Sequence, residues 1–288
     1  MTPPEHRVRL VTLTMLALLA FAGNSLLCRL ALTRTRIDAA SFTTIRVLAG
    51  AAVLVVLVTV RDRVRVTAGS WLSALALFVY AAGFSFAYRT LTAGTGALLL
   101  FGAVQATMIS VGIARGERLT PVQLGGLLCA YAGLIGLVLP GLAAPPLTSA
   151  ALMLCAGIAW GVYSLRGKGA GDPTAVTAGN FLRAVPMALL VSAIAFQTQR
   201  VDRLGAVYAA TSGCIASGVG YAVWYTALRD LRATTAATVQ LSVPIIAALG
   251  GVLLLHEPLT PRVIAAAVAI LGGVALVVTT RVRRQVLW

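Results

Sequence analysis

The chain has 288 residues, of which 59% are hydrophobic and only 11% charged, and its mean hydropathy is +0.93. A soluble globule of this length needs more polar surface than this composition supplies, so the sequence predicts an all-α integral membrane protein. The net charge of +15 does not indicate a nucleic-acid-binding protein, because Lys and Arg occur in ones, twos and threes between apolar runs. The four cysteines lie inside apolar segments without the spacing of metal ligands, so neither a metal site nor a cofactor is expected.

The apolar runs predict ten transmembrane helices, each long enough to cross about 30 Å of hydrocarbon. They are expected near residues 10–32, 39–60, 70–89, 94–113, 120–140, 147–166, 174–196, 205–228, 233–254 and 260–280. The first run could instead be a signal peptide, since Arg7 and Arg9 precede it and Ala20-Phe21-Ala22 resembles a cleavage site. Its apolar character continues to Leu32, which favours a membrane span.

The chain also repeats itself. Residues 117–121 (Glu-Arg-Leu-Thr-Pro) recur as residues 257–261 (Glu-Pro-Leu-Thr-Pro), 140 positions later, and Arg46 matches Arg183 at an offset of 137. We therefore expect two five-helix repeats, 1–142 and 147–288. Because five is an odd number of crossings, the second repeat must be inverted relative to the first, which places a substrate site near the midplane at their interface.

The positions of Lys and Arg predict the orientation of the chain. With the N-terminus inside, most basic residues that flank helices fall on the cytoplasmic face, including Arg61, Arg63 and Arg65, and fewer fall outside, such as Arg34 and Arg36. Both termini are therefore expected in the cytoplasm.

These features resemble a known family. Asn24 and Gly23 in the first helix, Arg46 in the second, and the acidic turns at Glu117 and Glu257 are similar to the EamA-like branch of the drug/metabolite transporter superfamily. The resemblance covers essentially the whole chain, and its plan is similar to bacterial aromatic amino acid exporters of the YddG type. It implies a ten-helix basket in the bacterial inner membrane, with a cavity lined mainly by helices 1, 3, 4, 6, 8 and 9. The implied partners are a small-molecule substrate and the lipid bilayer, with the protein a monomer or homodimer.

The acidic residues all fall in loops or at helix ends. Proton-coupled antiporters and exporters of cationic drugs usually need a carboxylate within the membrane, because a buried acid is the natural titratable site there. Its absence from the sequence favours a neutral or zwitterionic substrate.

Aromatic and polar side chains within the helices are the candidate substrate contacts. Tyr80, Phe84 and Tyr88 recur every four residues, which places them on one helix face, and Tyr221 and Tyr225 repeat the last two positions. Packing between helices and an interfacial aromatic belt are the alternatives, and Tyr88, Trp71 and Trp288 are assigned partly to that belt. The expected substrate pathway comprises Asn24, Tyr80, Phe84, Phe101, Gln105, Trp160, Tyr163, Tyr221, Trp224, Gln240 and Ser242.

A second group of residues is expected to be gating or structural. Arg46 and Arg183 could bind a substrate carboxylate, but the favoured interpretation is a structural one, with each arginine near one membrane face. Glu117 and Glu257 could lock the two faces in alternation, or simply be charged turns. Pro244 is expected to kink the helix near 233–254 at its middle.

The sequence thus favours an exporter of aromatic or other apolar amino acids and related small metabolites that works by alternating access. A multidrug or nucleotide-sugar carrier of the same fold is the alternative. A membrane enzyme would need a nucleophile, a metal cluster or paired carboxylates, and a scaffold would not need inverted symmetry, so both are disfavoured.

Overall fold

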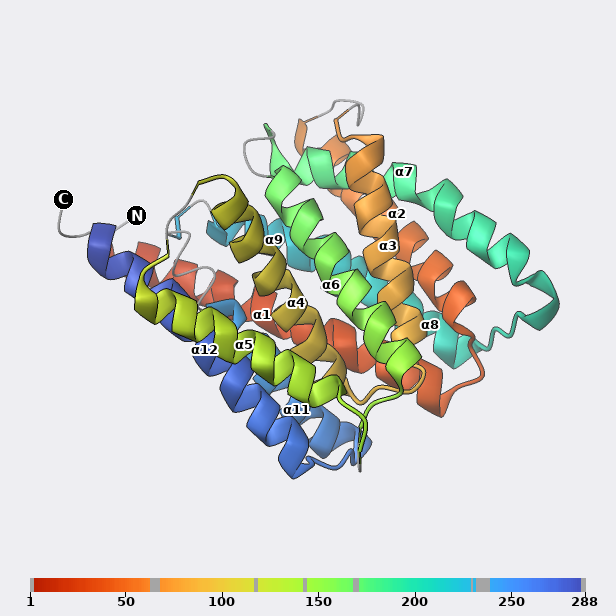
Figure 1. The fold of residues 1–288 in the computed structure, drawn as a ribbon. Helices are drawn as coiled ribbons and strands as arrows, with labels where there is room; N and C mark the ends of the chain where they lie inside the picture. The colour runs from red at the N-terminus through yellow and green to blue at the C-terminus, as the bar shows by residue number, and fades with distance from the viewer. Residues whose placement is uncertain are drawn as a thin grey trace.

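The computed structural model describes residues 3–62, 68–116, 119–141, 144–167, 171–228, 230–231 and 239–285. Within these ranges the regular structure is helical (Figure 1). The first half contains α1 (Pro3–Arg34), α2 (Ala39–Asp62), α3 (Trp71–Ala87), α4 (Ala93–Ala114) and α5 (Pro121–Val138). The second half contains α6 (Leu147–Gly167), α7 (Pro173–Ile194), the short η1 (Phe196–Thr198), α8 (Arg203–Thr211), η2 (Ser212–Val219), α9 (Gly220–Leu228), α11 (Ser242–Leu255) and α12 (Pro261–Gln285).

Eight helices in the described part of the chain are long and apolar enough to cross a membrane. One of them is the continuous run Arg203–Leu228, which joins α8, η2 and α9. The two other expected spans are present as shorter apolar helices, α3 with 17 residues and α11 with 14. The protein is therefore a multi-pass membrane protein. Of the ten expected crossings, eight correspond to helices that are long enough to span a membrane.

The starts of several helices follow from capping residues in the sequence. Ser70 and Thr92 accept hydrogen bonds from backbone N–H groups in the first turns of α3 and α4. Thr120 and Gln123 form a reciprocal capping box at the start of α5, with Pro121 in the first turn, where its missing N–H costs no hydrogen bond. At the start of α7, the side chain of Asp172 accepts a hydrogen bond from the backbone N–H of Thr174. Short polar side chains thus satisfy N–H groups that would otherwise lack partners.

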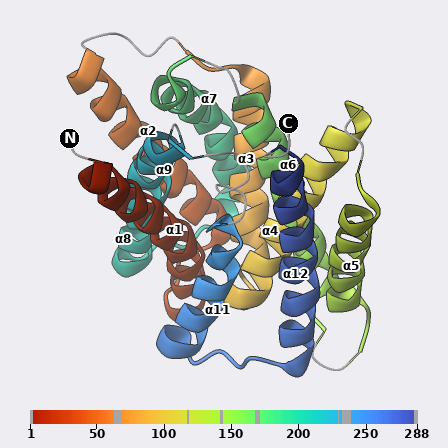
Figure 2. The same ribbon diagram turned by 90° about the vertical axis from the view of Figure 1, so that its left-hand side faces the viewer.

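The contacts between helices follow the same pattern in the two halves of the chain. If each helix of the first half is matched to its counterpart in the second half, every helix contact given below corresponds to another contact or to itself. The pairs α2 with α7, α4 with α11 and α5 with α12 map onto themselves. The contact between α3 and α6 corresponds to that between α9 and α1, and the contact between α4 and α6 corresponds to that between α11 and α1. The start of α1 and the end of α12 lie at the same end of the bundle (Figures 1 and 2).

Helices α5 and α12 lie side by side at one edge of the bundle (Figure 2). Their closest approach is at two glycines: a Cβ atom on Gly126 would lie 2.6 Å from the carbonyl oxygen of Gly273, and one on Gly273 would collide with that of Gly126. A Cβ atom on the adjacent Gly125 or Gly272 would have no neighbouring atom within 4 Å. Of the neighbouring glycines Gly125 and Gly126, and of Gly272 and Gly273, only Gly126 and Gly273 are therefore required for the close packing of the two helices.

Two expectations from the sequence are corrected by the structure. Tyr88 does not belong to an interfacial belt: it is fully buried, its ring lies against Gly96, and its hydroxyl donates to the carbonyl oxygen of Ala93. The helix expected near 233–254 is not continuous: residues 239–240 are helical, Leu241 is a turn, and α11 begins at Ser242, so the interruption lies just before Pro244, which is in the first turn of α11. Glu117 and Trp288 lie outside the described residues.

The glycine packing predicts a difference in stability between neighbouring substitutions. Gly273→Ala should lower the free energy of unfolding by about 1 to 3 kcal/mol, because the new methyl group meets backbone that cannot move independently. Gly272→Ala is the matched control and should leave stability unchanged or raise it by up to about 1 kcal/mol, since alanine favours helix over glycine. Thermal unfolding of the detergent-purified variants measures both, and equal losses in the two would contradict the packing.

Candidate functional site

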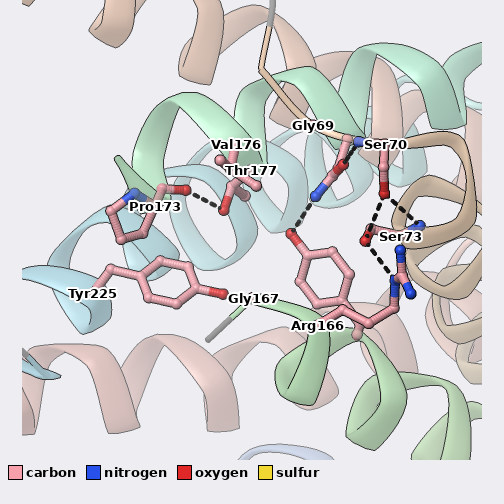
Figure 3. Close-up of a pocket in the computed structure, with 11 residues that line it drawn as sticks. Gly69, Ser70, Ser73, Arg166, Gly167, Pro173, Val176, Thr177 and Tyr225 are labelled. Carbon is pink, nitrogen blue, oxygen red and sulfur yellow. Dashed lines mark hydrogen bonds between the residues drawn. The ribbon is translucent and has the colours of Figure 1, made fainter. Parts of the chain in front are cut away.

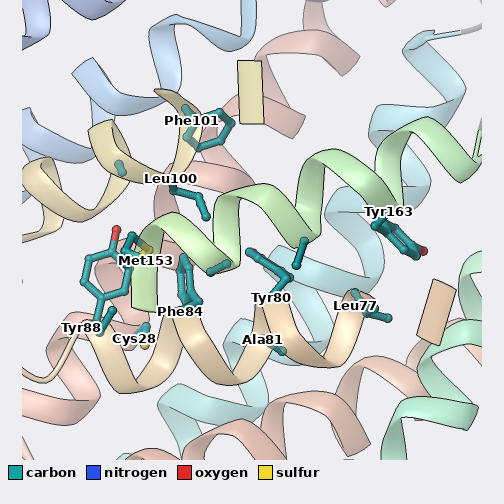
Figure 4. Packing of buried hydrophobic residues seen from close by; sticks show 14 of the residues in the cluster. Cys28, Leu77, Tyr80, Ala81, Phe84, Tyr88, Leu100, Phe101, Met153 and Tyr163 are labelled. Carbon is teal, nitrogen blue, oxygen red and sulfur yellow. The ribbon is translucent and has the colours of Figure 1, made fainter. Parts of the chain in front are cut away.

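A cluster of aromatic side chains lies where α3, α6 and α9 meet. Trp160 of α6 is at its centre, with ring centroids 4.7 Å from Tyr80, 5.4 Å from Tyr163 and 5.0 Å from Tyr221. Tyr80 also contacts Phe84, one helical turn further along α3, with centroids 5.5 Å apart (Figure 4). The four-residue spacing in α3 therefore does place its aromatic residues on a face that meets the other half of the chain.

The cluster encloses a small cavity of about 20 Å³, enough for roughly one water molecule. α1, α3, α4, α6, η2, α9 and the residues just before α11 all contribute to its wall. Most of the expected pathway residues line it, namely Asn24, Tyr80, Phe84, Phe101, Trp160, Tyr221 and Gln240. The interface between the two halves is therefore nearly closed around this cavity.

The four remaining pathway candidates lie elsewhere. Tyr163 stacks on Trp160 but faces a second pocket, and Trp224 is buried against Phe21 of α1. Gln105 is buried in α4 without lining the cavity, and the hydroxyl of Ser242 donates to the carbonyl oxygen of Val239. The sequence alone could not distinguish these four residues from the seven that line the cavity, because polarity or aromaticity does not show which face of a helix is turned inward.

Arg46 lies beside the wall of the cavity. Its side chain is only 2% exposed, and its guanidinium carbon lies 5.2 Å from the ring centroid of Tyr80 and 4.8 Å from that of Phe84. Nη2 donates to the hydroxyl of Tyr80 (3.0 Å) and Nε donates to that of Ser217 (3.2 Å). The arginine is thus held by hydroxyl groups and aromatic faces, which can stabilise a buried cation only in part.

A chain of hydrogen bonds connects this arginine to α1. Ser212 donates to the side-chain oxygen of Asn24 (2.6 Å), and the Asn24 amide donates to the hydroxyl of Tyr80 (3.2 Å). Both serines of this network, Ser212 and Ser217, belong to η2, a segment with wider π-type turns that packs against α2. Such segments often occur at functional sites. The Gly- and Ser-rich sequence of η2 was its only signal, and sequence analysis missed it.

Arg183, the repeat-related partner of Arg46, has different surroundings. It is half-buried, and Nη1 donates to the backbone carbonyl oxygens of Ala68 (2.7 Å) and Gly179 (2.9 Å). It therefore ties the segment before α3 to α7, as expected of a structural arginine, whereas Arg46 does not make this kind of contact.

A larger pocket of about 180 Å³ lies on the other side of the Trp160–Tyr163 stack (Figure 3). It lies between the start of α3, the end of α6 and the start of α7. Polar groups line it: Arg166 donates to Ser73 (3.1 Å), and Asn180 accepts from the backbone N–H of Ser70 (2.9 Å). We call this pocket the vestibule. Tyr163 lines the vestibule and Trp160 lines the central cavity, so these stacked rings lie between the two spaces.

An ion pair connects the helices at the opposite end of the bundle. Arg29 of α1 donates to the carboxylate of Glu257 (2.7 Å) and to the backbone oxygen of Tyr88 (2.9 Å). The other carboxylate oxygen of Glu257 accepts the backbone N–H of Ala93, at the start of α4 (2.7 Å). Both charged side chains are mostly buried, at 15% and 11% exposure. Sequence analysis identified Glu257 but missed Arg29, which is 228 positions away.

Three aspartates outside the helices, Asp38, Asp172 and Asp202, accept hydrogen bonds from backbone N–H groups at helix starts. Asp38 accepts hydrogen bonds from the backbone N–H groups of Ala40, Ser41 and Arg200. Burial acts to raise the pKa of Asp38, but these hydrogen bonds outweigh it and hold the pKa below its ordinary value. Asp38 is therefore charged at neutral pH and is not a proton carrier there.

Comparison with known proteins shows which proteins this chain is similar to. Residues 147–279 match the EamA-like transporter family. The chain is 58% identical over 283 residues to an uncharacterized protein of Pseudomonas aeruginosa, with 98% of both chains covered. It is 27% identical over 170 residues to an uncharacterized transporter of Archaeoglobus fulgidus, covering 57% of this chain and 60% of that one. The second half of the chain therefore contains an EamA-like transporter family domain.

A solved structure shares the fold of this chain. A crystal structure described only as that of a protein aligns with a TM-score of 0.65 at 16% identity, covering 95% of this chain and 98% of the other. This likeness shows the fold alone. The family match and the Archaeoglobus relative support a membrane transporter.

The buried ion pair of this EamA-like protein can be tested against an exposed one. Glu257→Gln removes the charge that faces Arg29, and hydrogen bonds to charged groups contribute about 1.5 to 3 kcal/mol, so the free energy of unfolding should fall by that order. Asp230→Asn is the control, because Asp230 pairs with His6 at 51% and 50% exposure and should change stability by less than about 0.5 kcal/mol. Thermal unfolding in detergent distinguishes them, and a larger loss in Asp230→Asn would contradict the assignment.

Proposed function

We propose that this protein exports aromatic and other apolar amino acids from the cytoplasm by alternating access. The observation that carries the proposal is the central cavity, which is walled by aromatic side chains of both halves and bordered by the buried Arg46. Aromatic rings offer a large, rigid contact surface to an apolar side chain. A cargo with an apolar side chain therefore suits these walls.

The proposed topology is ten crossings in two inverted repeats, with both termini in the cytoplasm. In this proposal α3 and α11 complete the count, although each is shorter than the other spans. The exchange of helix pairs between the halves supports it, as does the position of the chain's two described ends at one end of the bundle. The distribution of Lys and Arg indicates that this end faces the cytoplasm of a bacterial cell.

The two ends of the pathway differ in a way that fits alternating access. At the proposed outer end, Arg29 and Glu257 hold α1, α4 and the turn after α11 together. At the proposed inner end, the vestibule is separated from the cavity by the stacked rings of Trp160 and Tyr163. A rocking motion that parts the rings would admit cargo from inside, and one that breaks the ion pair would release it outside.

The alternative cargoes fit less well. A cationic drug would be repelled by the buried guanidinium of Arg46. The guanidinium also already covers the rings of Tyr80 and Phe84, so these rings are not available to a second cation. A nucleotide sugar carries two phosphates and needs several converging basic groups, whereas Arg46 is the only Lys or Arg residue found buried in the described part of the chain.

Transport into proteoliposomes tests the proposal. With equal pH on both sides, labelled phenylalanine, tryptophan and leucine should equilibrate faster than in protein-free vesicles, whereas lysine should not. Trp160→Ala should slow phenylalanine uptake by about tenfold, the equivalent of 1.4 kcal/mol, because the ring is at the centre of the aromatic cluster. Trp71→Ala is the matched control, since Trp71 is 61% exposed at the start of α3.

Two results would contradict the proposal. If no amino acid of the panel is transported, the cargo assignment is wrong. If phenylalanine moves only when a proton gradient is imposed, transport without a proton carrier is excluded, because a titratable group must then be part of the cycle.

A further inference from the structure

Three buried polar atoms in and beside the central cavity have no hydrogen-bond partner among the described residues. They are Nη1 of Arg46, the hydroxyl oxygen of Tyr221 and that of Ser25. Tyr221 and Ser25 line the cavity, and Arg46 contacts its wall through Tyr80. Buried polar groups are almost always paired, so three together without partners at one place in a bundle point to a ligand that is bound there.

The chemistry of these groups restricts the ligand. The guanidinium nitrogen can only donate, and each hydroxyl can donate its hydrogen. Tyr80 already accepts two hydrogen bonds, from Arg46 and from Asn24. The side-chain oxygen of Asn24 already accepts from Ser212. The site therefore offers several donors to a bound group and needs acceptors in return.

The charge of the site restricts it further. Arg46 carries a full positive charge in a nearly dry environment, and no ion pair joins it to a carboxylate of the described residues. The side chains that accept hydrogen bonds from the guanidinium, Tyr80 and Ser217, are neutral hydroxyls. A buried charge of this kind is costly without a counter-charge, so an anion stabilises the site.

We infer that the cavity beside Arg46 is a carboxylate-binding site, and that the cargo is recognised by its carboxylate and its apolar body while its ammonium group contributes little. This inference rests on the proposed function and narrows it to apolar monocarboxylates, of which amino acids are one kind. The carboxylate would accept from Nη1 of Arg46 and from the hydroxyls of Tyr221 and Ser25. Arg46 already lies over the rings of Tyr80 and Phe84, so these two rings attract the ammonium only weakly.

The size of the cavity sets the order of events. A space of about 20 Å³, enough for roughly one water molecule, holds neither a carboxylate nor a phenylalanine molecule until neighbouring side chains move. The aromatic side chain of the cargo must therefore displace neighbouring rings, and Trp160 is the best placed to move because it is only half-buried and borders the stack toward the vestibule.

Binding of four small probes to the purified full-length protein tests the inference. L-Phenylalanine, 3-phenylpropionate, phenylalaninamide and phenethylamine share one ring and differ in carboxylate and ammonium. Their affinities are measured by the change in tryptophan fluorescence. The two carboxylates should bind within about threefold of each other, and the two amines at least about tenfold more weakly.

Variants separate recognition from folding. Arg46→Gln should weaken both carboxylates by at least about tenfold and leave phenethylamine unchanged or slightly stronger. Tyr221→Phe should weaken the same two probes by a smaller factor, which keeps the inference testable if Arg46→Gln does not fold. Arg183→Gln is the matched control and should leave all four affinities unchanged. A purely structural role of Arg46 would weaken all four probes together.

The outcomes also separate the inference from the proposed function. If 3-phenylpropionate binds and depends on Arg46 while no amino acid is transported, the carboxylate site stands and the amino acid assignment fails. If phenylalanine is transported but phenethylamine binds equally well, or Arg46→Gln keeps full carboxylate affinity, the inference is overturned. It is also overturned if chloride, exchanged against methanesulfonate, competes with 3-phenylpropionate in the wild type, because the site would then hold an inorganic anion.

Discussion

The buried charge of Arg46 is the constraint on which the rest of the site depends. A guanidinium that is 2% exposed within a membrane-spanning bundle must be stabilised by its neighbours. Here the neighbours are the aromatic faces of α3, the hydroxyl of Tyr80 and a serine of η2. The aromatic cluster, the wide turns of η2 and the hydrogen bonds that reach α1 all follow from the need to hold this cation without a carboxylate. They leave one nitrogen of the guanidinium, Nη1, for a bound anion.

The two halves of the protein use the same residue differently. Arg46 and Arg183 are the pair expected to correspond in a repeat, yet one contacts the cavity wall and the other binds backbone oxygens before α3. Among the described residues, only the second half contains a segment with π-type turns, η2, and its Ser217 binds Arg46. The surroundings of the central cavity are therefore asymmetric.

The sequence predicted the local features well and the long-range contacts poorly. The apolar runs placed helix starts near residues 70, 94 and 120, close to the observed caps at Ser70, Thr92 and Thr120, and the aromatic face of α3 follows from spacing. Arg29 with Glu257 and Arg46 with Ser217 are separated by 228 and 171 positions, and no local pattern connects them. The spacing of Tyr88 gives a helix face but not the helix that covers it, which is why its expected place at the membrane interface is wrong. Its burial depends on Gly96, which leaves room for the ring on α4.

The central claim is that a carboxylate binds at Arg46 in the interface between the two halves. An experimental structure of the protein with 3-(4-iodophenyl)propionate tests it most directly, because the anomalous signal of iodine fixes the orientation of the ligand. We predict the carboxylate within about 3 Å of Nη1 of Arg46, a hydrogen-bonding distance, and the iodine beside Trp160. Binding of the carboxylate at Arg166 in the vestibule, with the Arg46 site unoccupied, would contradict the claim.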